Sequence, residues 1–492
     1  MIVVTFIVYV GLMMFIGYLA YRRTENLSDY ILGGRRLGSW VTALSACASD
    51  MSAWLLLGLP GYAYAAGLEA GWIALGLLVG TYLNWRLVAA RLRHYSFIAG
   101  NSQTLPEFFE QRFHDKTRLL RVVSALFILL FFLFYTSSGL VAGGKLFNAV
   151  FDLSYHWAVT VGALVIVAYT FFGGFLAVSW TDLLQGLLMA LALLIVPVIA
   201  MSRLGGWDAT FTSVSEINPA LLDALTNVKG EPLGFIATLS LMAWGLGYFG
   251  QPHILARFKA IRSVAEIPAA RRIAVSWVTI TLISAVLVGM VGIGYLEEPL
   301  QGPDTEKVFI LLVEALFHPL IAGLCLAAIL AAIMSTADSQ LLVSAAAFTS
   351  DFYKALFKRS AGEQELIWTG RIAVLFIAII ALVLAWNPER KVLDLVAYAW
   401  AGFGAAFGPT VILSLYWRRM NRHGALAGII VGGLTVVIWK QLSGGLFDLY
   451  EIVPGFILSM LSIVLTSVLT PAPEDVVLQD FDKVTGDLMG SE

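Results

Sequence analysis

Acidic and hydroxyl side chains stand inside two stretches whose other residues are mostly small or apolar. Residues 45–54 read SACASDMSAW with Asp50 near the centre, and residues 331–339 read AAIMSTADS with Ser335 and Thr336. Hydroxyls and freed backbone carbonyls can coordinate a monovalent cation within a membrane. These residue types can form a cation site, but a Ser-Thr pair in a membrane helix more often bonds back to the i−4 carbonyl of its own helix.

Asp50, Asp182 and Asp338 lie in apolar surroundings. A charge at membrane depth costs about 3 kcal/mol or more, so each acid is expected to have a compensating interaction or a function. Asp50 could neutralise a cation, orient an unwound backbone or cap the following helix, and Ser52 beside it can donate or accept a hydrogen bond. Asp182 begins an apolar run after the turn at 173–174, where it either stabilises the helix end or belongs to a pathway. Asp338 stands nearer the cytoplasmic end of its run and could simply be solvated.

Aromatic residues accompany these polar stretches. Trp244 and Tyr248 are spaced i and i+4, so they share a face if that stretch is helical. With Trp54 and Tyr135 they could form an aromatic wall around a small, partly apolar solute. Core packing is the alternative for each of them taken singly.

The composition requires membrane-crossing elements to position these residues. The chain is 59% hydrophobic and 13% charged, against roughly a quarter charged in soluble domains. Apolar runs of about 20 residues recur along the chain, and each is long enough to cross the hydrocarbon core of a bilayer. We predict an all-α membrane protein with thirteen transmembrane helices, beginning near residues 2, 38, 70, 119, 156, 178, 233, 273, 318, 367, 392, 424 and 450.

Two of the predicted spans are interrupted. The second contains the stretch 45–54, and the seventh contains WGLGYFGQP at 244–252, with three glycines and a proline. Because they are five spans apart, they cross the membrane in opposite directions. Inverted repeats predict such a pair, with the broken helices forming the substrate and ion sites near the midplane. The alternative is that small residues only allow close helix packing.

Basic residues predict the orientation. Most Lys and Arg residues fall in the connections 22–37, 91–121, 257–272, 354–371 and 418–422. The positive-inside rule places these connections in the cytoplasm. With thirteen spans, the N-terminus is then periplasmic and the tail 471–492 cytoplasmic, after a single transmembrane domain at 1–470.

Other classes of protein are disfavoured. The sequence has no HExxH, GxSxG or P-loop motif, and its histidines are scattered, so hydrolytic chemistry is not expected. Cys47 and Cys325 both lie in apolar runs, which leaves no disulfide framework or CxxC metal site. The net charge of −2 gives no reason to expect nucleic acid.

With these residues in view, the sequence resembles the solute:sodium symporter family over nearly its whole length. The resemblance is carried by DYILGGR at 29–35, the second span through GLPG at 58–61, FGGFLAVSWTD at 172–182, WGLGYFGQPHILARF at 244–258, ILAAIMST at 329–336 and AYAWAGFGAAFGP at 397–409. Such long agreement is more specific than any short motif.

The resemblance implies roles for individual residues. A sodium site would be formed by the backbone carbonyls of Ala48, Met51 and Ala332 with the hydroxyls of Ser335 and Thr336. Asp50 matches an acid needed for sodium-dependent uptake, and Ser52 the neighbouring hydroxyl. The substrate pocket would involve Trp54, Tyr135, Trp244, Tyr248 and Pro252. Arg35 and Asp182 match functionally sensitive positions on the cytoplasmic side.

The resemblance also implies a fold and an activity. The fold would be a LeuT-type core of five-plus-five inverted repeats at about 38–203 and 233–417, with one extra helix before it and two after it. The activity would be sodium-coupled import of L-proline across the bacterial inner membrane by alternating access, with membrane lipid but no obligate protein partner or nucleic acid. Another small zwitterionic solute, or a membrane sensor role, is the alternative. Family members often carry an uncharged residue where Asp338 stands, which points to a local difference in ion or proton handling.

Overall fold

The computed structural model describes residues 1–21, 31–172, 174–358 and 360–489. Within these ranges the chain is helical apart from turns, connections and two isolated bridges, Leu37 with Ile261 and Thr226 with Pro232. The predicted all-α class is therefore confirmed for the part of the chain that the structure describes. Most of the connection 22–37, the first two residues of the stretch 29–35 and Gly173 lie outside these residues.

Ten helical stretches in the described ranges are long and apolar enough to cross a membrane. Their main helices are α1 (Ile2–Tyr21), α5 (Gly71–Leu83) continuing through η4 (Asn84–Val88) into α6 (Ala89–Ile98), α8 (Leu119–Phe151), α10 (Phe175–Arg203), α14 (Ile267–Tyr295), α16 (Pro319–Ala346) with η9 (Ala347–Phe357), α17 (Glu363–Leu384), α18 (Val392–Tyr416), α19 (Arg422–Trp439) and α20 (Ile452–Leu469). Two shorter apolar stretches are α9 (Tyr155–Phe172) and α12 (Gly234–Met242) with η6 (Ala243–Gly250).

The remaining elements are short or lie at the ends of the bundle. They are η1 (Gly33–Arg35), α3 (Ser39–Asp50), η2 (Trp54–Gly58), α4 (Leu59–Ala66), η3 (Gly67–Ala70), α7 (Leu105–Arg112), α11 (Trp207–Ile217), η5 (Pro219–Leu222), α13 (Pro252–Ala260), η7 (Val264–Glu266), η8 (Gly302–Lys307), α15 (Val308–Leu316), η10 (Gly445–Asp448) and α21 (Asp475–Met489). The turn from α4 towards α5 is made at Gly67, whose φ of +68° favours glycine.

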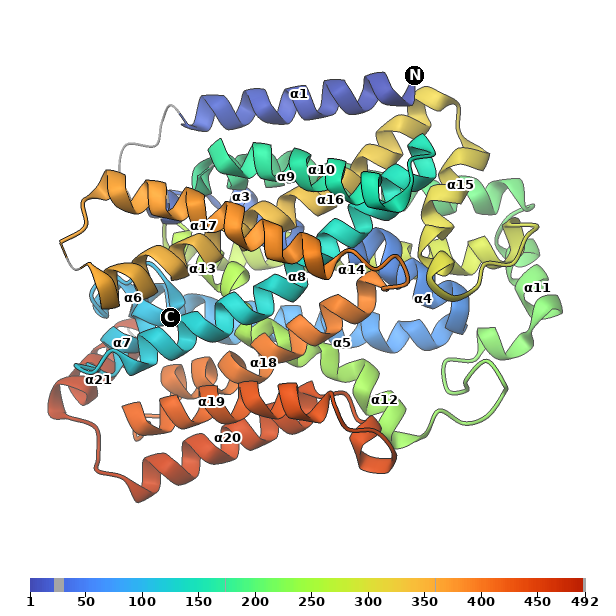
Figure 1. Cartoon of the computed structure of the whole chain (residues 1–492). Coiled ribbons are helices and arrows are strands. Elements are labelled where there is room, and N and C mark those ends of the chain that lie inside the picture. Colours follow the sequence, from blue (N-terminus) through green and yellow to red (C-terminus); the bar gives the residue numbers. More distant parts are fainter. Residues whose placement is uncertain (22–30, 173, 359, 490–492) are drawn as a thin grey trace.

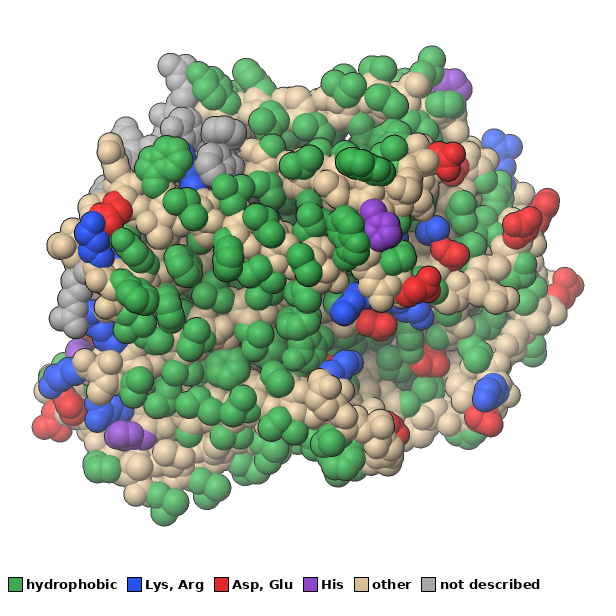
Figure 2. Space-filling view, viewed as in Figure 1, with side chains coloured by type: hydrophobic (Ala, Val, Ile, Leu, Met, Phe, Trp, Pro, Cys, Tyr) green, Lys and Arg blue, Asp and Glu red, His purple; other side chains and the backbone are tan. Residues whose placement is uncertain are grey.

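Most long helices run in the same general direction, so the molecule has two distinct ends (Figure 1). The N-terminus, α11 and α15 lie at the right-hand end in that view, and the C-terminus, α6, α7 and α21 at the left-hand end. Figure 2 shows that hydrophobic side chains cover the broad band between these ends, while charged side chains gather towards the two sides. An apolar band between two charged ends is the surface that a bilayer requires.

Helix α3 and helix α16 form the centre of the bundle. Residues 41–50 of α3 are all buried, and nearly every residue of α16 is buried as well. A membrane helix enclosed by other helices can carry polar residues, because they face protein rather than lipid. The two polar stretches found in the sequence are therefore placed side by side in the interior.

The C-terminal helix α21 packs across the left-hand end of the bundle. Phe481 and Val484 of α21 are buried, and Asp482 of the same helix pairs with Arg418 through two contacts of 2.8 Å. The hydrogen bonds from Arg418 hold the pKa of Asp482 below its ordinary value. The tail predicted at 471–492 is thus an ordered helix over most of its length.

Candidate functional site

The first interruption is a true break in the backbone between α3 and η2. Helix α3 ends at Asp50, and Met51 adopts φ −80° and ψ 72°, outside the helical region. The Asp50 carbonyl accepts hydrogen bonds from the Tyr135 hydroxyl at 2.8 Å and the Trp54 indole at 3.3 Å. Two of the predicted pocket aromatics therefore meet at the break, where their polar atoms hold the freed backbone.

The hydroxyls of α16 converge on the last turn of α3. Ser335 donates to the Ala48 carbonyl at 2.8 Å and also lies 3.2 Å from its own i−3 carbonyl, Ala332. Thr336 lies 3.3 Å from the same Ala48 oxygen. Four of the five predicted sodium ligands are thus gathered between two helices, and the fifth, Met51, is the residue that ends α3. Local back-bonding alone, the alternative interpretation, does not describe these hydroxyls.

Asp50 points its carboxyl group into a small cavity on another side of the break. The side chain is 2% exposed and its Oδ1 has no hydrogen-bond partner. Thr81, Asn84 and Tyr248 line the same cavity, and each contributes a buried oxygen without a partner. The Asn84 amide group donates to the Tyr248 carbonyl at 3.0 Å, which leaves its own oxygen for the cavity. Four oxygens without a basic neighbour suit a cation, a proton donor or water.

The capping interpretation of Asp50 is wrong. The residue that precedes η2 is Ala53, and no side chain caps that helix start. Ser52 instead serves the turn, because its hydroxyl lies 3.4 Å from the Trp54 amide. Within the described part of the chain, Asp50 takes part in none of the ion pairs, so its buried charge has no protein counter-ion.

The second interruption has a different construction. Residues 243–250 form the 3₁₀ helix η6, Gln251 is extended, and Pro252 opens α13 as its first residue. A Cβ on Gly245 would collide with the backbone of Gly76, and one on Gly250 with the carbonyl of Phe403. The glycines of this break are needed for close packing, which was the alternative interpretation of this span.

Trp244 and Tyr248 do not share a face, so the expectation that their i, i+4 spacing brings the two rings together is wrong. In a 3₁₀ helix, residues i and i+4 lie about 120° apart around the axis. The Trp244 ring lies 6.2 Å from the Trp54 ring, whereas Tyr248 packs edge-on against Trp400 at 5.0 Å. Trp54 and Trp244 thus form one aromatic pair, and Tyr248 faces the cavity beside Asp50.

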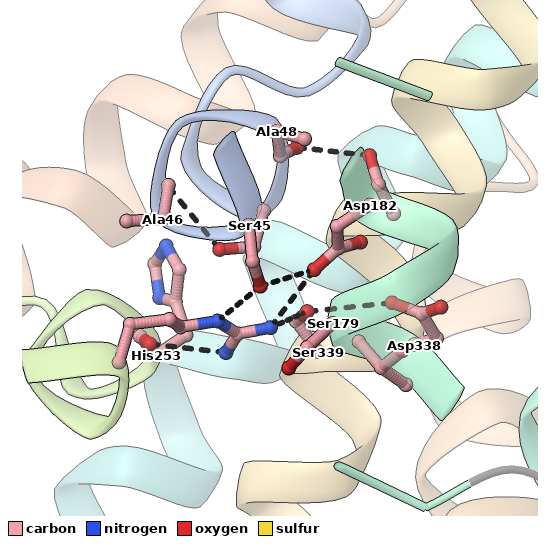
Figure 3. A network of polar contacts seen from close by, with 12 residues as sticks. Ser45, Ala46, Ala48, Ser179, Asp182, His253, Asp338 and Ser339 are labelled. Atoms are coloured by element: carbon pink, nitrogen blue, oxygen red, sulfur yellow. Dashed lines mark hydrogen bonds and ion pairs between the residues drawn. The ribbon is translucent and has the colours of Figure 1, made fainter. Parts of the chain in front are cut away.

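Asp182 is not a helix-end acid. Helix α10 begins at Phe175, and the residue before it, Gly174, makes no side-chain cap. Asp182 is fully buried inside the helix, where it accepts a hydrogen bond from Ser45 at 2.7 Å and pairs with Arg257 at 3.2 Å (Figure 3). A buried ion pair is the reason that this acid is held at membrane depth.

Asp338 belongs to the same network and is not solvated. Its carboxyl group accepts a hydrogen bond of 3.3 Å from Ser339, whose hydroxyl also contacts Arg257 at 2.5 Å (Figure 3). Asp338, like Asp182, has one carboxyl oxygen without a partner. The Arg257 guanidinium therefore pairs directly with Asp182 and is linked to Asp338 through the Ser339 hydroxyl.

Sequence reasoning missed Arg257, Ser45, Thr81 and Asn84. Arg257 counted as part of the basic connection 257–272, but it is fully buried. The sequence feature that could have identified Arg257 is its position in the stretch 244–258, on the helix that follows the break. Thr81 and Asn84 are polar, three residues apart and inside an apolar run, so their spacing on one helix face was available as a signal.

Arg35 lies away from both breaks. Its guanidinium donates to the Ser96 hydroxyl at 2.9 Å, the Ser102 carbonyl at 2.9 Å and the Lys259 carbonyl at 3.1 Å. It therefore ties the chain before α3 to the ends of α6 and α13, at the end of the molecule that holds the C-terminus.

A bundle of membrane-length helices around a buried polar centre, with two interrupted helices, is the construction of a secondary transporter. Residues 30–432 match the sodium:solute symporter family, and the chain belongs to that family. It is 52% identical to the high-affinity proline transporter of Bacillus subtilis, covering 96% of this chain and 98% of the relative. It is also 52% identical to the sodium/proline symporter of Salmonella typhimurium, covering 98% and 95%.

Comparison with solved structures gives the fold independently. A Na⁺-coupled sialic acid symporter, in a substrate-bound outward-open state, superimposes with a TM-score of 0.79 at 19% identity, over 96% of this chain and 98% of that one. The protein is therefore a multi-pass membrane transporter of the LeuT-type fold rather than an enzyme.

Proposed function

We propose that this protein imports L-proline together with sodium across the bacterial inner membrane by alternating access. The substrate assignment is supported by 52% identity to two proline transporters over nearly the full length of each. The observation that carries the coupling is the convergence of Ser335 and Thr336 on the Ala48 carbonyl, at the point where α3 breaks.

Sodium would bind between α3 and α16. The carbonyls of Ala48, Met51 and Ala332 and the hydroxyls of Ser335 and Thr336 supply neutral oxygens at the end of a helix, where carbonyl dipoles favour a cation. In the structure the hydroxyl of Ser335 donates to Ala48. A sodium ion would replace that hydrogen bond with direct coordination of both oxygens.

Proline would bind at the breaks. Proline is a compact zwitterion with an apolar ring, so its site should combine polar partners with an aromatic surface. The Trp54 and Trp244 pair offers that surface, and the starts of η2 and α13 offer amide groups for a carboxylate. Ser52, Tyr135, Tyr248 and Pro252 complete the proposed pocket.

Asp50 would balance charge beside this pocket. Its carboxyl group is buried without a basic partner, so a cation in or next to its cavity lowers the cost of keeping it ionised. Asp182, held by Arg257, would instead fix the position of α10 against α3. Arg35 would hold the entry to α3 on the cytoplasmic side.

The proposed topology has thirteen transmembrane helices. The ten long stretches become thirteen when α9 and α12 through α13 are counted and when α3 with η2 and α4 is separated from α5 through α6. The core repeats would then be about 38–203 and 233–417 within a transmembrane domain at 1–470, followed by the tail at 471–492. The N-terminus would be periplasmic and the C-terminus cytoplasmic.

Coupling between sodium and proline would follow if sodium orders the backbone at the first break. A sodium ion bound to Ala48 and Met51 fixes the backbone that proline must also contact, so the solute pays less ordering entropy when it arrives. Linkage requires proline to raise sodium affinity by the same factor. A negative-inside potential adds about 2.3 kcal/mol per 100 mV for each charge that crosses the whole field.

The test is uptake of labelled proline by proteoliposomes under a sodium gradient. Ser335→Ala should raise the sodium concentration for half-maximal uptake by about tenfold or more, since loss of one ligand is worth on the order of 1.4 kcal/mol. Ser344→Ala is the matched control, because it changes the same residue type on the same helix at a hydroxyl that has no partner. Proline uptake by the wild type that does not depend on sodium would refute the coupling. Preference for another zwitterion would refute the substrate assignment. Binding of proline without transport would favour a sensor role.

A further inference from the structure

A basic cavity of about 560 Å³ lies at the end of the molecule that holds the C-terminus. It is lined by residues of η4, α6, η7, the start of α14, the end of α18 and the end of α21. Its lining has Trp85 in common with the small cavity beside Asp50 and includes no residue of either break. The cavity is therefore a feature separate from the proposed sodium and proline sites.

Three guanidinium groups give this cavity an excess of positive charge. Arg86, Arg91 and Arg271 line it, and none of the three joins an ion pair with a carboxylate in the described part of the chain. The acid present, Asp487, is already paired with His94 at 3.0 Å. Guanidinium groups are well suited to bind phosphate oxygens in pairs.

Two of these arginines are held in place by neighbouring groups. Arg91 donates to the Leu415 carbonyl at 3.0 Å and stacks over the Tyr416 ring at 4.2 Å. Arg271 lies over the Tyr82 ring at 5.9 Å. Neither contact neutralises the charge, so both groups remain available to an anion while losing little freedom when it binds.

An exposed apolar stripe leads from the membrane band to the cavity. Leu75, Val79, Leu83 and Leu87 are between 37% and 45% exposed, and their spacing of four places them on one face of α5 and η4. Leu87 itself lines the cavity. The stripe thus joins a lipid-facing surface to a phosphate-binding one.

We propose that this cavity binds the phosphate headgroup of an anionic membrane phospholipid, whose acyl chains lie along the stripe of Leu75, Val79, Leu83 and Leu87. Free phosphate shares the headgroup chemistry, but it would make no use of the apolar stripe. Basic pockets between transmembrane helices are a recurrent form of lipid-headgroup site.

The site would act on the second break through η4. Trp85 lines the cavity, and its ring packs on Phe258 of α13 at 4.5 Å. The residue before it, Asn84, donates to the Tyr248 carbonyl in η6. A bound headgroup would therefore steady the half-helices on both sides of Gln251, and transport would be faster in membranes that contain anionic lipid.

The experiment measures lipid binding by the purified full chain, without sodium or proline, by native mass spectrometry and thermal unfolding. Phosphatidylglycerol should be retained and should raise the unfolding temperature, whereas phosphatidylcholine and inorganic phosphate should do neither. Arg271→Gln should weaken phosphatidylglycerol binding by about fivefold, the effect of one arginine near a lipid surface. Arg272→Gln, an exposed neighbour that does not line the cavity, should bind as the wild type does.

Equal retention of the two lipids, or an equal loss in both variants, would overturn the proposal. Stabilisation by inorganic phosphate alone, matching that by phosphatidylglycerol, would replace the lipid site with a free-anion site. Because the measurement contains no solute, a failure of the proposed proline transport leaves its result unchanged. If Arg271→Gln does not fold, the comparison of the two lipids on the wild-type protein still decides the question.

Discussion

The two interrupted helices break for different physical reasons. At the first break the chain leaves the helix after Asp50, and the released carbonyl is held by Tyr135 and Trp54 while the carboxyl oxygen Oδ1 has no hydrogen-bond partner. At the second break the glycines of η6 allow backbones to touch, and the Gln251 side chain itself satisfies the Gly247 carbonyl at 3.1 Å. The first break is a change of backbone direction beside a carboxyl group, whereas the second is set by glycine packing and leaves its unpartnered polar atoms on the side chains of Tyr248, Gln251 and His253.

The difference teaches that an interrupted helix in a sequence has two possible meanings. Unpartnered oxygens around the break indicate a binding role, as at Asp50. Collisions of a hypothetical Cβ indicate a packing role, as at Gly250. Substitution of Asp50 should therefore impair transport, whereas substitution of a packing glycine at the second break should impair folding.

The largest effect is expected for Asp50→Asn. Asparagine keeps the shape of the side chain but cannot balance a cation, so sodium-driven proline uptake should fall by about a hundredfold or more. The unfolding temperature without sodium should stay equal or rise, because an unpaired buried charge is removed. Uptake by proteoliposomes and thermal unfolding of the same preparation measure both. The matched control is Asp394→Asn, which changes an exposed acid. Wild-type uptake by Asp50→Asn would contradict the proposed role of the Asp50 charge in transport.

A smaller effect on transport, with a large one on stability, is expected for Gly250→Ala. The new methyl group would meet the Phe403 carbonyl and the Gly408 amide, and such overpacking costs about 1–3 kcal/mol. Thermal unfolding should show a clear drop, while the sodium dependence of the remaining uptake stays normal. Gly11→Ala is the control, since nothing lies within 4 Å of its Cβ position. A stable Gly250→Ala variant with altered sodium dependence would show that Gly250 acts on the sodium site rather than in packing.

The smallest effect is expected for Trp244→Ala. Loss of its contact with the solute and with Trp54 should weaken proline binding by about 1–3 kcal/mol. Sodium binding measured without proline should change little, because Trp244 lies on η6 rather than between α3 and α16. Titration calorimetry with each ligand separates the two. Trp157→Ala is the control, because Trp157 is 68% exposed. An unchanged proline affinity in Trp244→Ala would mean that Trp244 serves only in core packing.

The sequence predicted the helical class, the two breaks and the meeting of Ser335 and Thr336 with Ala48. The helical class and the breaks depend on the lengths of the apolar runs and on the residues that interrupt them, whereas the place of Ser335 and Thr336 beside Ala48 follows from the resemblance. The sequence did not predict that Arg257 would be buried against Asp182, because a basic residue at the end of an apolar run looks like a solvated one. The separation of Trp244 from Tyr248 was also out of reach, since whether a glycine-rich stretch winds as α or 3₁₀ is decided by its tertiary contacts.

The contact of η6 with α5 has a mechanical consequence. At Gly76, Gly80 and Gly245 the two backbones touch without any side chain between them. Helices that pack through side chains can shift from one set of grooves to the next. Two backbones in direct contact have no such alternative packing, so η6 and α5 could only separate and leave a void between them. The two elements should therefore move as one rigid body, so that any tilt of η6 carries the helix holding Thr81 and Asn84 with it.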